Sequence, residues 1–92
     1  MEIIFKPSFQ RDTGHVKDRE LLIVLKEKVQ QISKAQSVNN ITGLKLLKGY
    51  SHQFRIVVKT GRFSYRIGDV IRKNKIWMVR FLPRKIIYEK FP

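Results

Sequence analysis

The sequence contains no cysteine, and only seven of its 92 residues are acidic. The missing cysteine excludes disulfides, thiolate metal sites and cysteine nucleophiles, and it permits a reducing compartment. Long hydrophobic runs are also absent, since none approaches the roughly 18 apolar residues of a membrane span, and the N-terminus lacks the basic start and apolar core of a secretory signal. These absences predict a soluble, cytoplasmic protein without membrane segments.

The length and composition fit one compact domain over residues 1–92. A hydrophobic content of 42% is enough for one core, and single domains most often run to roughly 100–150 residues. No repeat, low-complexity tract or long linker divides the chain. We therefore expect a single domain.

Positive charge is concentrated in the C-terminal half. The net charge is +13, of which residues 1–43 contribute +2 from seven basic and five acidic groups, and residues 44–92 contribute +11 from thirteen basic and two acidic groups. A one-sided positive potential attracts polyanions and steers their approach. Nucleic acid is the expected partner, and an acidic protein is the second candidate.

The N-terminal half predicts a short strand followed by helices. Residues 2–6 have the composition of a strand, which Pro7 ends because proline has no N–H to donate. A brief helical turn is expected over residues 8–13, stopping at Gly14. A longer helix is expected over residues 18–35, with Asp18 as its N-cap. Its apolar residues recur at helical spacing: Leu21, Leu22, Leu25, Val29 and Ile32.

The C-terminal half has the period of two that is typical of strands. Alternation begins at Phe54, and Thr60-Gly61 supplies a turn before residues 62–67 repeat the pattern. A second turn over residues 72–75 leads to a third strand over residues 76–81, in which Trp77, Val79 and Phe81 are expected on one side. Pro83 suits the first turn of a short helix through about Lys90.

Together these elements predict a small α+β fold, with two N-terminal helices on one face of a twisted antiparallel sheet of about four strands and a short C-terminal helix. The apolar sides of the strands face the long helix, so the polar sides share the other face. That face is expected to carry Arg55, Lys59, Arg62, Ser64, Arg66 and Arg80. Because only Asp69 and Glu89 are acidic beyond residue 43, these cations have few internal partners. The alternative is that they are ordinary solvated strand residues.

The sequence lacks the patterns of metal, nucleotide and nucleophilic-serine sites. His15 and His52 are far apart, and neither a glycine-rich phosphate loop nor a serine elbow occurs. We expect no metal and no cofactor. RNA can still be cleaved by a purely cationic site, because its 2′-hydroxyl is the nucleophile and arginines stabilise the charge that develops on the phosphate.

Such a site also needs a proton acceptor and a proton donor. Tyr88, with Arg84 one turn before it, is the candidate for this role, although a tyrosine near a C-terminus is as often a packing residue. Lys45 and Lys48 could hold phosphates or be exposed loop lysines, and His52 is a further proton-transfer candidate. Tyr65 and Trp77 are predicted to lie in the core.

The order of motifs resembles the RelE/ParE superfamily of bacterial toxins from toxin–antitoxin pairs. Residues 43–49, "GLKLLKG", are similar to the family's "L-x-G-x-K-x-L-K-G" connector. The stretches "FRIVV", "GRFSYRI" and "IWMVRFLPRKIIY" are similar to the family's "YRIRV", "YRIIYEI" and "ILRVGHRKEVY". The resemblance covers nearly the whole chain, and it rests on the order and spacing of the pieces.

This resemblance implies a toxin that cuts mRNA in the ribosomal decoding site without a metal, and a cognate, usually acidic, antitoxin. By position, Arg62 matches the arginine that contacts the scissile phosphate, Arg55 matches a basic residue of the preceding strand, and Tyr88 matches the C-terminal tyrosine. Arg80 and Arg84 match the two arginines around the end of the last strand. Lys45, Lys48, Lys59 and Arg66 are the expected RNA-binding residues.

Two departures from the family pattern keep alternatives open. Pro83 stands where many members have histidine, and Val57 stands where some ribosome-dependent nucleases have a lysine. Proton transfer would then rest on Tyr88, Lys48 or His52. The alternatives are a catalytically weakened RNA-binding homologue, or a ParE-like toxin that inhibits DNA gyrase by binding it.

Overall fold

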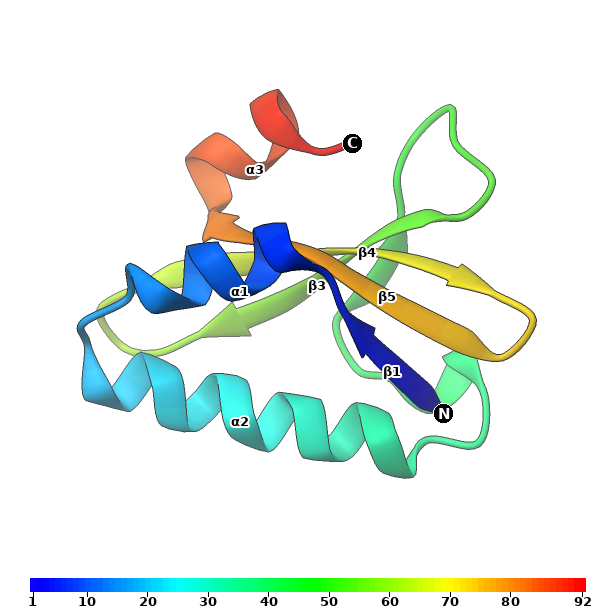
Figure 1. Cartoon of the computed structure of the whole chain (residues 1–92), viewed down its shortest axis with the longest axis horizontal. Helices are drawn as coiled ribbons and strands as arrows, with labels where there is room; N and C mark the ends of the chain where they lie inside the picture. Colours follow the sequence, from blue (N-terminus) through cyan, green and yellow to red (C-terminus); the bar gives the residue numbers. More distant parts are fainter.

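The computed structural model describes all 92 residues as a five-stranded sheet with helices on both faces (Figure 1). The strand order is β1-β5-β4-β3-β2, with β1 parallel to β5 and the other neighbours antiparallel. The elements in chain order are β1 (Glu2–Phe5), α1 (Pro7–Gly14), α2 (Arg19–Lys34), a 3-10 helix (Val38–Asn40), β2 (Leu44–Leu46), β3 (Gln53–Lys59), β4 (Ser64–Arg72), β5 (Lys75–Pro83) and α3 (Arg84–Lys90).

The α+β prediction is confirmed, although the strand count and direction differ from the expected sheet. The segment predicted as a connector contains β2, an edge strand that pairs with β3. Three residues are too few to display an alternating pattern, so the sequence alone could not distinguish β2 from a loop. The N-terminal strand pairs in parallel with β5, which is distant in the sequence, and no local pattern gives the direction of such a pairing.

Both N-terminal helices form where the sequence predicts them. Pro7 occupies the first turn of α1, where its missing N–H leaves no hydrogen bond unmade. The Asp18 carboxylate accepts a hydrogen bond from the Leu21 N–H at 2.9 Å and so caps α2. Leu21 and Ile32 of α2 are fully buried against the sheet.

A β-bulge in β5 changes which residues face the core. Gly68 pairs with Arg80 and Asp69 pairs with Met78, so Val79 has no partner on β4. The prediction that Trp77, Val79 and Phe81 share one side of the strand is therefore wrong. Phe81 lies in the core with Ile76 and Met78. Trp77 and Val79 are only half-buried.

The two faces of the sheet are covered differently. Helix α2 covers one face, whereas α3 and the β2–β3 loop rise from the opposite side, with the C-terminus between them (Figure 1). Phe91, just after α3, fills the space above Gly68, where a Cβ would come within 2.6 Å of the Phe91 ring. The polar face is therefore partly closed by the C-terminal segment. None of the helices combines the length and apolar character needed to cross a membrane.

Candidate functional site

The strand register aligns basic residues in a row across the face that α3 covers. Lys45 of β2 lies opposite Arg55 of β3, Arg55 lies opposite Gly68 of β4, and Gly68 lies opposite Arg80 of β5. The predicted side of the sheet is therefore right for Arg55 and Arg80. Phe91 over Gly68 interrupts the row, and the cations on its two sides have different surroundings.

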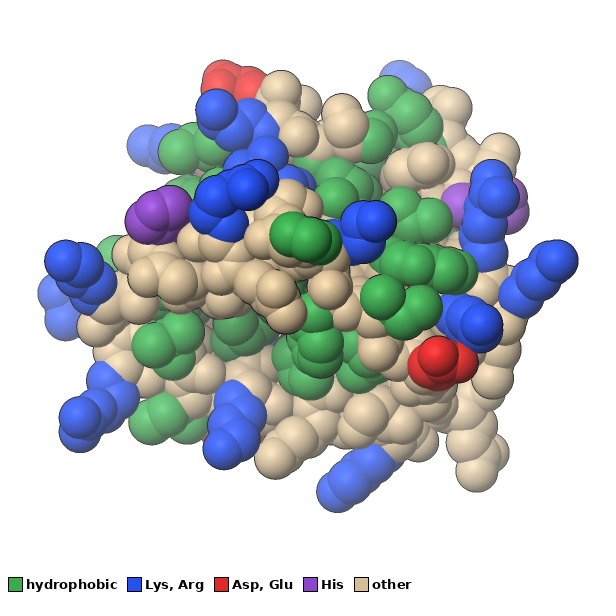
Figure 2. Space-filling view, viewed as in Figure 1, with side chains coloured by type: hydrophobic (Ala, Val, Ile, Leu, Met, Phe, Trp, Pro, Cys, Tyr) green, Lys and Arg blue, Asp and Glu red, His purple; other side chains and the backbone are tan.

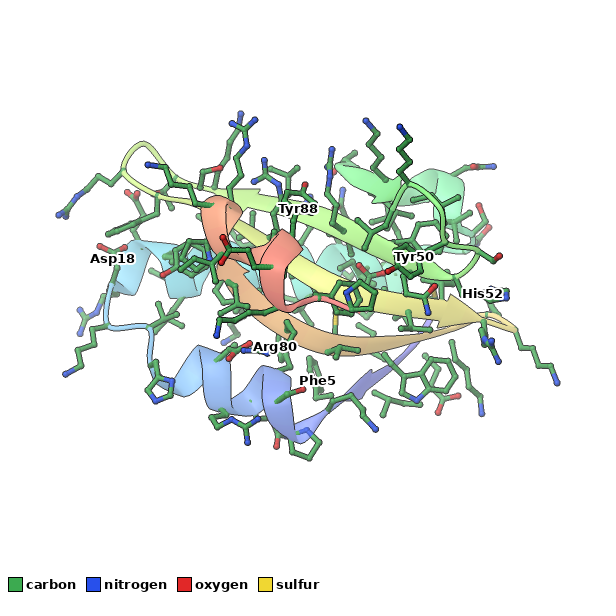
Figure 3. All side chains as sticks on the ribbon, turned by 90° about the horizontal axis from the view of Figure 1, so that it is seen from above. Phe5, Asp18, Tyr50, His52, Arg80 and Tyr88 are labelled. Atoms are coloured by element: carbon green, nitrogen blue, oxygen red, sulfur yellow. The ribbon has the colours of Figure 1, made fainter.

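Arg80 is held by an internal carboxylate and does not face an open hollow. Its Nε and Nη2 donate to the two oxygens of Asp12, at 2.7 and 3.1 Å, and the Phe81 N–H donates to the same carboxylate at 2.9 Å. The hydrogen bond to Asp12 raises the pKa of Arg80. Figure 3 shows Arg80 beside α1, away from Tyr88 and Tyr50. The expected convergence of Arg55, Arg62 and Arg80 in one hollow is wrong in this respect.

Arg62 precedes β4 and lies in the β3–β4 turn, so the expected alternation starts only at Ser64. The Arg62 side chain is 76% exposed, lies 3.7 Å from the Asp18 carboxylate, and has its guanidinium carbon 5.5 Å from the centre of the Phe63 ring. The turn is fixed by the Thr60 hydroxyl, which accepts from the Arg62 and Phe63 N–H groups.

Arg66, expected as an exposed RNA-binding residue, is buried. Only 8% of the residue is exposed, and its Nη1 donates to the Ser64 hydroxyl and the Tyr65 carbonyl. Its buried Nε has no hydrogen-bond partner. The prediction assumed that the polar face is open to water, whereas α3 packs against β4 over this part of it.

Tyr88 instead faces a cleft with three basic residues, which we call the Tyr88 cleft. This cleft of about 230 Å³ is lined by Lys45, Leu46, Leu47, Lys48, Arg55 and Tyr88. Tyr88 is 55% exposed. Arg55 is oriented by a 2.9 Å hydrogen bond from Nη1 to the Gly43 carbonyl. None of the three cations forms an ion pair within the chain.

A second basic cleft lies at the start of α3, and we call it the Arg62 cleft. It has a volume of about 430 Å³ and is lined by Arg62, Phe63, Ser64, Tyr65, Pro83, Arg84 and Lys85. Arg84 and Tyr88, one turn apart on α3, thus line different clefts. Lys59 is exposed at the end of β3, and His52 lines neither cleft.

Lys and Arg side chains project around most of the molecular outline in Figure 2, and acidic side chains are sparse. Hydrophobic side chains show between α1 and α2, where Phe5 and Leu22 help to line a shallow groove. Nowhere do three His, Asp or Glu side chains gather closely enough to hold a metal ion.

Sequence reasoning missed three features of these surfaces. The Asp12–Arg80 pair joins residues 68 positions apart, so no local sequence pattern could predict it. Phe91 and Tyr50 were also overlooked, although Tyr50 is an aromatic residue inside a polar loop, and its 47% exposure sets it apart from the core. An aromatic residue between Gly49 and Ser51 was the available signal.

Comparisons with known proteins agree with this architecture. No family model matches the chain. The chain is 34% identical, over the full length of both proteins, to a curated protein named toxin RelE3 from Methanocaldococcus jannaschii. Among solved structures it is similar to a chain of a RelB–RelE antitoxin–toxin complex from Methanococcus jannaschii, with a TM-score of 0.74 and 30% identity, covering 97% of this chain and 99% of the other.

Proposed function

This chain belongs to the RelE family of toxins, and from that premise we propose that it is the toxin of a toxin–antitoxin pair that cleaves mRNA on the translating ribosome without a metal ion. The observation that carries the proposal is the Tyr88 cleft. Lys45, Lys48 and Arg55 surround one exposed phenol there, and none of them is neutralised by a carboxylate. An uncompensated group of cations in a cleft is suited to a phosphate ester.

In the proposed reaction the RNA supplies its own nucleophile. The 2′-oxygen bonds to the adjacent phosphorus and the bond to the 5′-oxygen breaks, which leaves a cyclic phosphate and a 5′-hydroxyl. Lys45 and Arg55 stabilise the negative charge that builds on the phosphate oxygens; removing one such donor typically costs about 10²–10³ in rate. Tyr88 and Lys48 are the groups in the cleft that can move the two protons, one from the 2′-hydroxyl and one to the 5′-oxygen.

The Arg62 cleft is proposed to hold a second part of the RNA. The contact between Arg62 and Asp18 is long and the Arg62 side chain is mostly exposed, so the pair should contribute little, about 0–1 kcal/mol. Arg62 can therefore turn to a phosphate at little cost, together with Arg84. Arg80 is different, because it would have to leave two hydrogen bonds with Asp12; we assign it to holding α1 against β5.

The cognate antitoxin is proposed to place an acidic segment over the same clefts. This segment would neutralise the cations and exclude RNA at once. Because part of the affinity would come from ion pairing, the complex should weaken as salt is added. An affinity indifferent to salt would indicate inhibition at another surface.

The test is to map RNA 5′ ends after brief expression of the protein and of matched variants. We expect new 5′ ends within translated mRNA and arrested translation for the natural sequence. Arg55→Ala, Arg62→Ala and Tyr88→Phe should each reduce both effects. Lys73→Ala, in the β4–β5 turn, lines neither cleft; it is the control and should leave both effects unchanged. Equal toxicity and cleavage in all these variants would contradict the assignment.

One observation favours the second candidate, a catalytically weakened RNA-binding homologue. Arg80 is engaged by Asp12, Arg62 and Arg84 line the other cleft, and Pro83 stands where many members have histidine, so the Tyr88 cleft lacks several groups that the family pattern implies at the phosphate. RNA binding without new 5′ ends would support this alternative. DNA-damage signalling with intact mRNA would instead support inhibition of gyrase.

A further inference from the structure

A third cleft continues from the Tyr88 cleft, and aromatic side chains line it. Its volume is about 320 Å³, and its lining residues are Leu47, Lys48, Tyr50, Tyr88, Phe91 and Pro92. Leu47, Lys48 and Tyr88 belong to both spaces. We call it the aromatic cleft. A cationic compartment and an aromatic compartment therefore meet at Lys48 and Tyr88.

Tyr50 is not required by the core. It is 47% exposed, and its side chain makes no hydrogen bond to the rest of the chain. Its position is nevertheless well fixed, because the Tyr50 N–H donates to the Leu47 carbonyl across a turn in which Gly49 adopts a φ of +86°. The loop is tied to the sheet at both ends, by Leu47 N–H to the Gln53 carbonyl and by Ile71 N–H to the His52 carbonyl.

An exposed aromatic ring held by an anchored loop is suited to stacking. Figure 3 shows Tyr50 on the β2–β3 loop and Tyr88 on α3, both on the face that α3 covers. A tyrosine side chain has only two rotatable bonds, and the backbone that carries it is anchored, so it loses little freedom when a flat group stacks on it and more of the contact energy remains for binding. Every nucleobase offers such a flat face, but only when it is unstacked from its neighbours, as in single-stranded RNA.

We propose that the aromatic cleft is a nucleobase site, in which Tyr50 stacks on the base of the nucleotide adjacent to the phosphate held in the Tyr88 cleft. Lys48 lies at the junction and reaches the phosphate that joins the two nucleotides. This inference rests on the proposed function only in taking RNA as the ligand. It does not require that the RNA be cut.

The test measures binding of two short single-stranded oligonucleotides to protein carrying Tyr88→Phe, which keeps the ring and removes the hydroxyl proposed for proton transfer. One oligonucleotide is ordinary RNA, and the other has the same backbone without bases. Adding Tyr50→Ala should weaken binding of the RNA about 5- to 150-fold, the range for loss of one base–aromatic stack. Binding of the abasic oligonucleotide should be unchanged, and Tyr50→Trp should retain the affinity for RNA.

Several results would overturn the base site. An equal loss for both oligonucleotides would mean that Tyr50 acts through the backbone phosphates, and no loss for either would mean that it is not a ligand contact. Loss of antitoxin binding alone would make the aromatic cleft a protein contact. Failure of the Tyr88→Phe protein to bind either oligonucleotide would contradict RNA as the ligand of this cleft. Because Tyr50 is exposed, unchanged urea unfolding of Tyr50→Ala shows that the fold is intact.

Failure of the base site and failure of the proposed nuclease are distinguishable. One outcome is that Tyr50→Ala loses base-dependent binding while the natural protein does not cleave RNA. This outcome supports the base site and contradicts the nuclease. If the natural protein cleaves RNA, and the Tyr50→Ala variant binds and cleaves RNA equally well, only the base site is contradicted.

Discussion

Replacing Asp69 should stabilise the protein, because this carboxyl group is buried without a partner. Asp69 is fully buried in β4 between Ile67 and Ile71, and its cross-strand neighbours are Phe54 and Met78. Neither carboxyl oxygen has a hydrogen-bond partner. An unsatisfied buried polar group costs about 1–3 kcal/mol even when it is uncharged. Asp69→Val removes that group and suits a strand, so we expect a gain of this order.

Ionisation adds a pH-dependent part to the prediction. Burial raises the pKa of Asp69 well above its ordinary value. In the unfolded chain an aspartate titrates near about 3.9, so above that pH the folded state retains a proton that the unfolded state has released. The natural protein therefore loses stability as the pH rises from about 4 to the folded-state pKa of Asp69, by at most about 1.4 kcal/mol per pH unit.

Two variants separate the contributions in urea unfolding measured at pH 4 and pH 7. Asp69→Asn keeps the shape and the unsatisfied polar atoms but cannot ionise, so its stability relative to the natural protein should rise between the two pH values. Asp69→Val should show the same rise on top of a gain already present at pH 4. Other carboxylates contribute equally to all three proteins and cancel. Glu27→Gln, which alters an exposed carboxylate that forms no ion pair, is the surface control. If both Asp69 variants were destabilised equally at the two pH values, the reasoning would be refuted.

Three further predictions concern the surroundings of the site. Asp12→Ala should lower the free energy of unfolding by about 3 kcal/mol. This value is the lower end for breaking a buried ion pair, because 23% of the Arg80 side chain is exposed. A urea unfolding midpoint equal to that of the natural protein would contradict this. Gly68→Ala should displace the Phe91 ring and cost about 1–3 kcal/mol, which limited proteolysis would detect as earlier cleavage in α3. Lys45→Ala should reduce the slope of log affinity for single-stranded RNA against log salt concentration by about 0.7, as measured by titration at several salt concentrations, because it removes one phosphate contact.

Local patterns were sufficient to predict most of the fold. The helix α2 was predictable because its cap, Asp18, and its apolar stripe are all encoded within a few turns. The alternation on β3 was predictable because one face is buried by α2 and the other is not. The turn at Lys73 and Asn74 was also predictable, because it joins two strands with a period of two. Both turn residues adopt positive φ.

The site was less predictable, because it depends on contacts between distant parts of the chain. The side of the sheet on which Arg80 lies could be deduced, but its partner, Asp12, belongs to a helix at the other end of the sequence. The bulge at Val79 shifts the faces of β5 without any change in the residue pattern. Phe91 covers Gly68, and nothing near either residue in the sequence predicts that contact.

The location of the free cations follows from where carboxylates can reach. Of the two acidic residues beyond residue 43, Asp69 is buried in the core and Glu89 forms no ion pair. The carboxylates paired with Arg80 and Arg62 therefore come from the N-terminal half: Asp12, near the end of α1, binds Arg80, and Asp18, at the start of α2, lies near Arg62. The strands farthest from α1 in the sheet are β2 and β3. Lys45, Lys48 and Arg55 form no ion pair within the chain, and for that reason an external polyanion meets the weakest internal competition at the edge formed by β2, β3 and α3.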